Sequence, residues 1–460
     1  MSKFDMIIKN GMIVTASDRY KGDIGIIDSK IAEIAVNLHD DADKVIDAAN
    51  KFVFPGGIDG HTHLDMPFGG TFSSDDFITG TKAAACGGTT TIVDYSVQPQ
   101  GKSLSEAAKI WHEKADNKAC IDYAFHIAIT DVNENTIKEM PIMVEKGYSS
   151  FKVYMVYDGM RVEDGEFIEI LENAAKCGAT IGVHCENYYV IKYLTEKLLT
   201  EGKIEPKYHP ISRPAACEGE AANRAIRLAE MADAPLFIVH NSCEESISEI
   251  KSARERGVKV MGETCPQYLI RSIDDYEEPN FAGSKYVMSP PLRDKKNWDY
   301  IWKSIKEGVL QTVATDHCPF FMEQKKLGID DFTKIPNGAP GIELRMPIML
   351  SHGPKHGLTY EKIVEVTATN PAKVFGMYPQ KGTIAVGSDA DLFLYDPNKK
   401  VTVNVDMLHE NVDYTTFDGE QLDGYPVMTI CRGKVIAENG EFVGEEGYGK
   451  FVKRGKGQIL

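Results

Sequence analysis

The sequence predicts an α/β fold: a (β/α)8 barrel of the TIM type with a small β-sandwich domain formed by both chain ends. Through the middle of the chain, about eight short apolar segments alternate with stretches of helical period. Both ends instead carry strand-like segments without helices between them. The 460 residues, 43% of them hydrophobic, suffice for one barrel and an accessory domain. A doubly wound open sheet is the competing architecture.

The amino-terminal part, residues 1–54, alternates short apolar runs with turns, which is the pattern of a small β structure. The expected strands are 5–14, 23–27, 30–34 and 44–47.

The barrel is expected over residues 55–372, with its first strand beginning slightly earlier. Its expected strands are 52–58, 89–95, 123–129, 150–154, 180–184, 236–240, 258–263 and 312–315. Most are followed by helical material. Acidic and hydroxyl residues at 73–76 cap the first expected helix. The expected helices are 77–85, 104–115, 166–176, 219–231, 244–256 and 359–370.

The carboxyl-terminal part, residues 373–460, returns to strand-like segments at 382–385, 390–395 and 427–431. Because they resemble the opening segments, we expect the two ends to build one domain that flanks the barrel. The basic segment 448–456 predicts a solvated tail, and docking on an acidic neighbouring subunit is the alternative.

Composition excludes several classes of partner. The net charge of -17 argues against nucleic acid, because phosphate binding needs a basic face. No segment is long and apolar enough for a signal peptide or a membrane span. The nine cysteines form no Cys-x-x-Cys pair, and a chain of this size needs no disulfides. We therefore expect a cytoplasmic protein with no membrane partner.

His61 and His63 follow an apolar strand and lie two residues apart. In an extended chain, residues i and i+2 point the same way, so two imidazoles can converge on one cation. Taken alone, the pair is explained equally well by two histidines that hydrogen bond to backbone carbonyls.

Other expected strand ends carry residues that bind metals, and barrel enzymes place their chemistry there. Lys152, His184, His240 and Asp316 all occupy such positions. Each alone is an ordinary strand-end residue, but their conjunction favours a site for Zn²⁺ or a similar divalent ion. Lys152 would be repelled by cations unless CO2 converted it to a carbamate, whose two oxygens could bridge a metal pair. His317 is a candidate outer partner, and the remaining histidines are interpreted as structural.

A set of longer motifs resembles the cyclic amidohydrolases, within them the D-hydantoinase and dihydropyrimidinase group, across nearly the whole chain. The motifs lie at 57–63, 66–71, 75–77, 87–91, 150–154, 183–187, 263–268, 288–293, 314–318 and 336–338. The resemblance implies a barrel with a β-sandwich, a homotetramer and two zinc ions. One zinc would be held by His61, His63, Asp316 and carboxylated Lys152. The other would be held by Lys152, His184 and His240.

The resemblance also implies the reaction, in which a metal-bridging hydroxide opens a cyclic amide or imide to an N-carbamoyl amino acid. The substrates implied are 5-substituted hydantoins and dihydropyrimidines. Asp316 would take the proton from the attacking group and deliver it to the leaving nitrogen. Tyr157 would contact the developing oxyanion, and aromatic packing is its structural alternative. Ser289 and Asn337 would bind the amide edge of the ring, largely through main-chain groups.

Substrate preference is expected from a gate formed by Leu64, Met66, Phe68 and Tyr154. Asp65 stands where related dihydroorotases have arginine, which argues against a dihydroorotase. An allantoinase-like enzyme remains the alternative. A non-catalytic scaffold relative is less favoured because the chain keeps every expected ligand.

Overall fold

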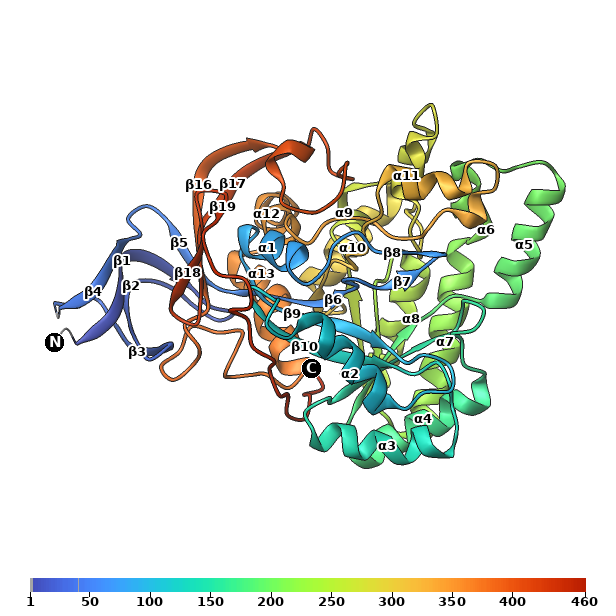
Figure 1. Ribbon diagram of the computed structural model, residues 1–460, viewed down its shortest axis with the longest axis horizontal. Helices are drawn as coiled ribbons and strands as arrows, with labels where there is room; N and C mark the ends of the chain where they lie inside the picture. Colours follow the sequence, from blue (N-terminus) through green and yellow to red (C-terminus); the bar gives the residue numbers. More distant parts are fainter. Residues whose placement is uncertain (1–2, 40) are drawn as a thin grey trace.

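Two large sheets organise the molecule, with the barrel and its helices beside a sheet built from both ends of the chain (Figure 1). The computed structural model describes residues 3–39 and 41–460. The barrel sheet has eight strands in the order β15-β14-β13-β12-β11-β10-β9-β6. The second sheet has nine strands, ordered β19-β18-β17-β16-β5-β1-β2-β3, with β4 paired to β1.

The barrel strands are short, parallel and buried. They are β6 (Gly57–Thr62), β9 (Thr89–Val97), β10 (Asp122–Ala128), β11 (Ser150–Tyr154), β12 (Thr180–His184), β13 (Leu236–Ile238), β14 (Val260–Thr264) and β15 (Thr312–Val313). The ring is closed just beyond β15, where Asp316 N donates to His61 O at 3.0 Å and Thr62 bridges to His317. The predicted barrel is therefore confirmed, and the open sheet is excluded.

Helices surround the barrel (Figure 1). The helices of eight or more residues are α1 (Thr79–Cys86), α2 (Leu104–Ala115), α3 (Glu134–Glu145), α4 (Asp164–Cys177), α5 (Tyr188–Thr200), α7 (Ala215–Ala232), α8 (Glu244–Glu255), α10 (Lys296–Lys306) and α12 (Arg345–His352). Helix α2 shows why the local sequence folds this way. Ser103 and Glu106 form a capping box, and the face with Trp111 is buried. Four of these helices were not predicted: α3, which contains Pro141, α5, which buries only Ile191 and Leu198, and also α10 and α12.

Strands from both ends share the second sheet. They are β1 (Phe4–Val14), β2 (Arg19–Ile27), β3 (Lys30–Ala35), β4 (Ala42–Asp47), β5 (Phe52–Pro55), β16 (Leu392–Thr402), β17 (Gln421–Cys431), β18 (Lys434–Glu438) and β19 (Glu441–Phe442). β5 pairs with β1 on one side and antiparallel with β16 on the other, which joins the two ends. The shared-domain prediction is confirmed, whereas the boundaries 54/55 and 372/373 stay predictions.

Two strand predictions were wrong. The segment 52–58 is not one barrel strand, because β5 belongs to the second sheet and β6 to the barrel. Gly56 separates them, and a Cβ there would meet Thr90 Oγ1 at 2.0 Å. Residues 382–385 form a loop.

The basic tail lies against its own barrel, so the prediction of a solvated tail was wrong, whereas docking on a neighbouring subunit stays a prediction. Val452 N donates to Tyr123 O at 2.8 Å, at the start of β10. Arg454 is 3% exposed and donates to Ser150 Oγ at 2.7 Å. The apolar side chains Phe451 and Val452 within the basic segment explain its packing. Among the described residues, no helix is long and apolar enough to cross a membrane.

Candidate metal centre and substrate cleft

The six predicted metal ligands meet at the carboxyl end of the barrel. His61 lies in β6 and Lys152 in β11, His184 ends β12, and the others follow strand ends. Asp316 Oδ1 lies 3.1 Å from His61 Nε2 and 3.2 Å from His63 Nε2. On the other side, the rings of His184 and His240 have centroids 4.5 Å apart. The chain thus brings all the predicted ligands into one cluster.

The cluster fits a divalent cation. His61, His240 and Asp316 offer ligand atoms that lie within 4.8 Å of one another. Three buried nitrogens, His61 Nε2, His63 Nδ1 and His240 Nδ1, have no hydrogen-bond partner among the described residues. Burial lowers the pKa of His63 to about 4, so its ring is the neutral form that coordinates metals. Buried imidazole nitrogens grouped with a carboxylate are the kind of ligand set that zinc prefers.

Lys152 is buried in the wall of the same cleft, close enough for its charge to act on all four histidines. The residue is 1% exposed, and its Nζ lies 4.6 Å from the centroid of the Tyr95 ring. Burial lowers the pKa of Lys152 to about 8. A substantial fraction of this amine is therefore neutral near pH 8, and the neutral amine is the form that reacts with CO2.

Buried carboxylates orient two of the histidines from behind. Glu263 Oε1 lies 2.7 Å from His61 Nδ1, and Glu186 Oε2 lies 2.7 Å from His184 Nε2. Such partners fix the tautomer and leave the other ring nitrogen for a metal. Burial opposes ionisation of Glu186, but Arg213, at 2.6 Å, helps to bring its pKa down to about 2. The sequence analysis assigned neither role, although Glu263 lies in β14 at its carboxyl end, where the strand-end rule applies.

Tyr157 faces the cluster from the loop after β11. Its ring centroid lies 5.1 Å from that of His184 and 5.5 Å from that of Phe68. Burial raises the pKa of Tyr157 well above its usual value, so its hydroxyl is a proton donor across the neutral range. Ser289 and Asn337 line the same cleft, and Ser289 Oγ donates to Asn337 Oδ1 at 3.3 Å.

Comparison with known proteins assigns the chain to a family. The model of the amidohydrolase family matches residues 52–436. The chain belongs to the amidohydrolase family. The D-hydantoinase of Geobacillus stearothermophilus is 48% identical over 454 residues, which cover 98% of this chain and 96% of that relative. The D-hydantoinase of Ralstonia pickettii is 47% identical over 455 residues, 98% and 99% of the two chains. A dihydropyrimidinase structure from Brevibacillus agri has a TM-score of 0.98 at 48% identity and covers 100% of both chains.

Within the amidohydrolase family, the chain is an enzyme of the D-hydantoinase and dihydropyrimidinase group. The predictions of the family and of the enzyme class are confirmed. The assignments of individual site residues stay predictions, which the geometry above supports.

The four residues predicted to form a gate divide between the cleft and the core. Met66, Phe68 and Tyr154 line the cleft, as expected. Leu64 does not, because it is 0% exposed and packs against Gly80 of α1. Leu64 is therefore left out of the proposed gate. Met160 and Cys318 also line the cleft, and the sequence analysis missed both. Met160 follows no strand directly, so the strand-end rule gave no signal for it.

His317 lies behind the site, as expected. Its Nε2 lies 3.0 Å from Asp75 Oδ2, and its Nδ1 accepts from Gly341 N at 3.1 Å. The ring thus ties the Asp316 segment to two loops. His126, interpreted as structural, is also buried and hydrogen bonds with Ser150 Oγ and Gly60 O.

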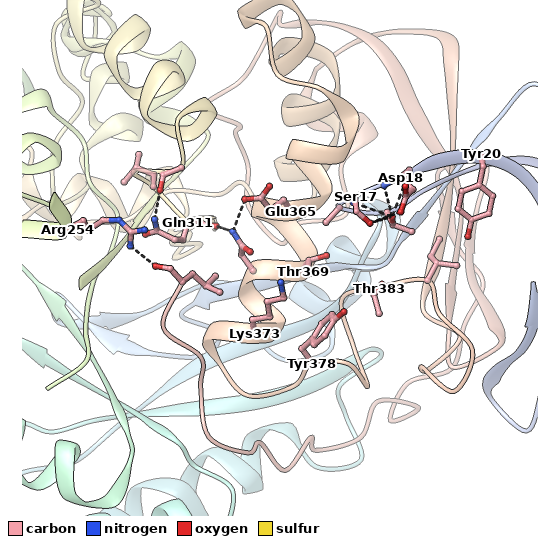
Figure 2. A pocket seen from close by; sticks show the side chains of 17 residues that line it. Ser17, Asp18, Tyr20, Arg254, Gln311, Glu365, Thr369, Lys373, Tyr378 and Thr383 are labelled. Atoms are coloured by element: carbon pink, nitrogen blue, oxygen red, sulfur yellow. Dashed lines mark hydrogen bonds between the residues drawn. The ribbon is translucent and has the colours of Figure 1, made fainter. Parts of the chain in front are cut away.

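A larger cleft of about 650 Å³ lies at the opposite end of the barrel, next to the turn between β1 and β2 (Figure 2). Arg254 donates to Val260 O and Leu460 O at its edge. Lys373 points into this cleft in Figure 2. None of its described lining residues is a histidine or a cysteine. The candidate chemistry of the amidohydrolase therefore resides in the smaller cleft over the strand ends.

Proposed function

We propose that the protein is a zinc-dependent hydrolase that opens cyclic amides, namely 5-substituted hydantoins and dihydropyrimidines, to N-carbamoyl amino acids. One observation carries the proposal: four histidines, Asp316 and Lys152 converge at the floor of a cleft that Tyr157, Ser289 and Asn337 also line. The D-hydantoinase and dihydropyrimidinase relatives at 47–48% identity supply the substrate class.

The residues divide between two metal positions in this proposal. His61, His63 and Asp316 would hold one ion, and His184 and His240 the other. Lys152, as N6-carboxylysine, would be shared by both positions, which its burial in the wall of the same cleft supports. A pair of divalent ions supplies a nucleophile at neutral pH and polarises the ring carbonyl.

The side chains of the cleft would carry the rest of the reaction. Tyr157 donates its hydroxyl hydrogen to the carbonyl oxygen as negative charge grows there. The bond from water oxygen to the carbonyl carbon forms, and the ring C–N bond breaks. Asp316 takes the proton from water at a carboxylate oxygen and returns it to the leaving nitrogen. Ser289 and Asn337 hold the amide edge, and Met66, Phe68 and Tyr154 face the substituent.

The test measures metal content and ring opening together. Purified protein is expected to hold about two zinc ions per chain and to open hydantoin, a 5-substituted hydantoin and dihydrouracil, with N-carbamoyl products identified by mass. Allantoin and dihydroorotate are the contrasting substrates. Turnover of allantoin alone would instead indicate an allantoinase-like enzyme. Protein that holds its metals but opens neither hydantoin nor dihydrouracil would contradict the proposal. We also propose a homotetramer, to be checked by light scattering.

A further inference from the structure

We propose that Lys325 is a positioning residue that holds the two substrate-binding loops, those of Ser289 and Asn337, in one fixed relation. This inference rests on the proposed function, because those loops are assigned to the amide edge of the ring. Lys325 ends the short helix α11 (Met322–Lys325) and is 0% exposed. It lines no part of the cleft itself.

The ammonium group of Lys325 uses all three of its donors on main-chain carbonyls. Its Nζ lies 2.9 Å from Val287 O, 2.7 Å from Pro336 O and 2.7 Å from Gly338 O. Val287 lies two residues before Ser289, and Pro336 and Gly338 flank Asn337. A lysine ammonium has three hydrogens and no acceptor, so this donor set is complete.

Two side chains from outside these loops hold only the Ser289 loop. Tyr268 Oη donates to Pro290 O at 2.7 Å, and His209 Nε2 lies 2.8 Å from Met288 O. Both act on the Ser289 loop. Lys325 reaches the two loops together. Two direct bonds also join them, from Gly338 N to Val287 O at 3.0 Å and from Ser289 Oγ to Asn337 Oδ1 at 3.3 Å.

The position of Lys325 is costly, which argues against an incidental placement. Burial lowers the pKa of Lys325 to about 7, whereas the three carbonyl oxygens around its Nζ favour the charged form, the only one with three donors. Carbonyl dipoles that converge on a buried cation fix the peptide planes on either side of Asn337. The main-chain groups that would contact the ring are then already in position before the substrate binds. Less conformational entropy of the loops is therefore lost on binding.

The test compares Lys325→Met with Lys326→Met. Lys326 is the adjacent lysine, but it is exposed and pairs with Glu323 at 2.9 Å on the surface. For Lys325→Met we expect KM for hydantoin to rise about tenfold or more while kcat stays within about threefold. The weakened contacts hold the substrate equally well in its ground state and in its transition state. Metal content should not change. Lys326→Met should match the unmodified protein in both constants.

A second readout does not depend on activity. Amide hydrogen exchange in peptides covering 287–290 and 336–338 should accelerate in Lys325→Met, while exchange in β10 and β12 stays unchanged. A general loss of stability would instead accelerate exchange throughout and lower the active fraction at constant KM. If the unmodified protein opens no cyclic amide, the proposed function fails, and the exchange measurement alone decides the role of Lys325.

Folded Lys325→Met with an unchanged KM and unchanged exchange in both loops would overturn the proposal. Should Lys325→Met not fold, Lys325→Gln replaces it, since an amide keeps two donors. That variant is expected to raise KM less and to loosen the two loops selectively. A Lys325→Gln protein identical to the unmodified one in KM and in loop exchange would refute the role equally.

Discussion

Tyr157→Phe separates transition-state stabilisation from metal binding, because it removes one oxygen and leaves the ring in place. The ring contacts with His184 at 5.1 Å, Phe68 at 5.5 Å and Tyr154 at 6.0 Å do not need the hydroxyl. Phenylalanine should therefore pack in the same way. The lost donor acts where charge develops, and removal of one such donor typically costs a factor of about 10²–10³ in kcat, or about 3–4 kcal/mol.

The assay measures kcat, KM and zinc content on the same preparation of Tyr157→Phe. We expect kcat for hydantoin to fall by about 10²-fold or more, with KM changed by less than about threefold and metal content unchanged. The high pKa of Tyr157, raised by burial, keeps the hydroxyl protonated, so the ratio of the two kcat values should not vary between pH 6 and 9. A Tyr157→Phe enzyme with unchanged kcat would refute the oxyanion role, and loss of metal would show that the hydroxyl supports the ligands instead.

Three further substitutions and treatments test the centre and the fold. Lys152→Ala should lose zinc and activity together, because the oxygens of the proposed carbamate are shared ligands. The control His112→Asn, on the outer helix α2, should keep both zinc and activity. Full activity with bound metal in Lys152→Ala would contradict the carbamate. Removal of zinc by a chelator should abolish turnover, and added Zn²⁺ should restore it. The measurement is activity as a function of bound metal. Activity that persists in metal-free protein would exclude a role for metal in the reaction. Lys381→Met should lower the free energy of unfolding by about 3–5 kcal/mol in denaturant melts, because it strands the buried carboxylates of Asp122 and Asp391, now 2.5 and 2.6 Å from Nζ. A loss below about 1 kcal/mol would show that Arg432, 3.1 Å from Asp122, compensates for the missing cation.

The sequence predicts the floor of this site better than its walls. Five strand ends carry the metal-binding residues, and the barrel brings strand ends together whatever the details of packing. His184 and Asp316 could therefore be placed from apolar segments alone. Met160 lies on a loop, and a loop follows no period that would show which side chain faces the cleft. Leu64 shows the opposite error. It was predicted to belong to the gate because its neighbours in the loop do, but its side chain packs against Gly80.

The backbone of the site shows a cost that no sequence pattern displays. Tyr157, His240 and Asp316 have φ angles of 83°, 40° and 55°, in the left-handed region that residues other than glycine seldom adopt, although asparagine, aspartate and histidine do so more often than the rest. Each such residue costs about 1–3 kcal/mol, so surrounding contacts must offset it. All three follow closely after a barrel strand, where the chain turns away from the sheet. Glycine would relieve the strain at each position but would remove a hydroxyl donor, an imidazole ligand or the proton-carrying carboxylate. Of the three, tyrosine is the residue type least suited to this region, which indicates that the chain keeps Tyr157 for its chemistry rather than for stability.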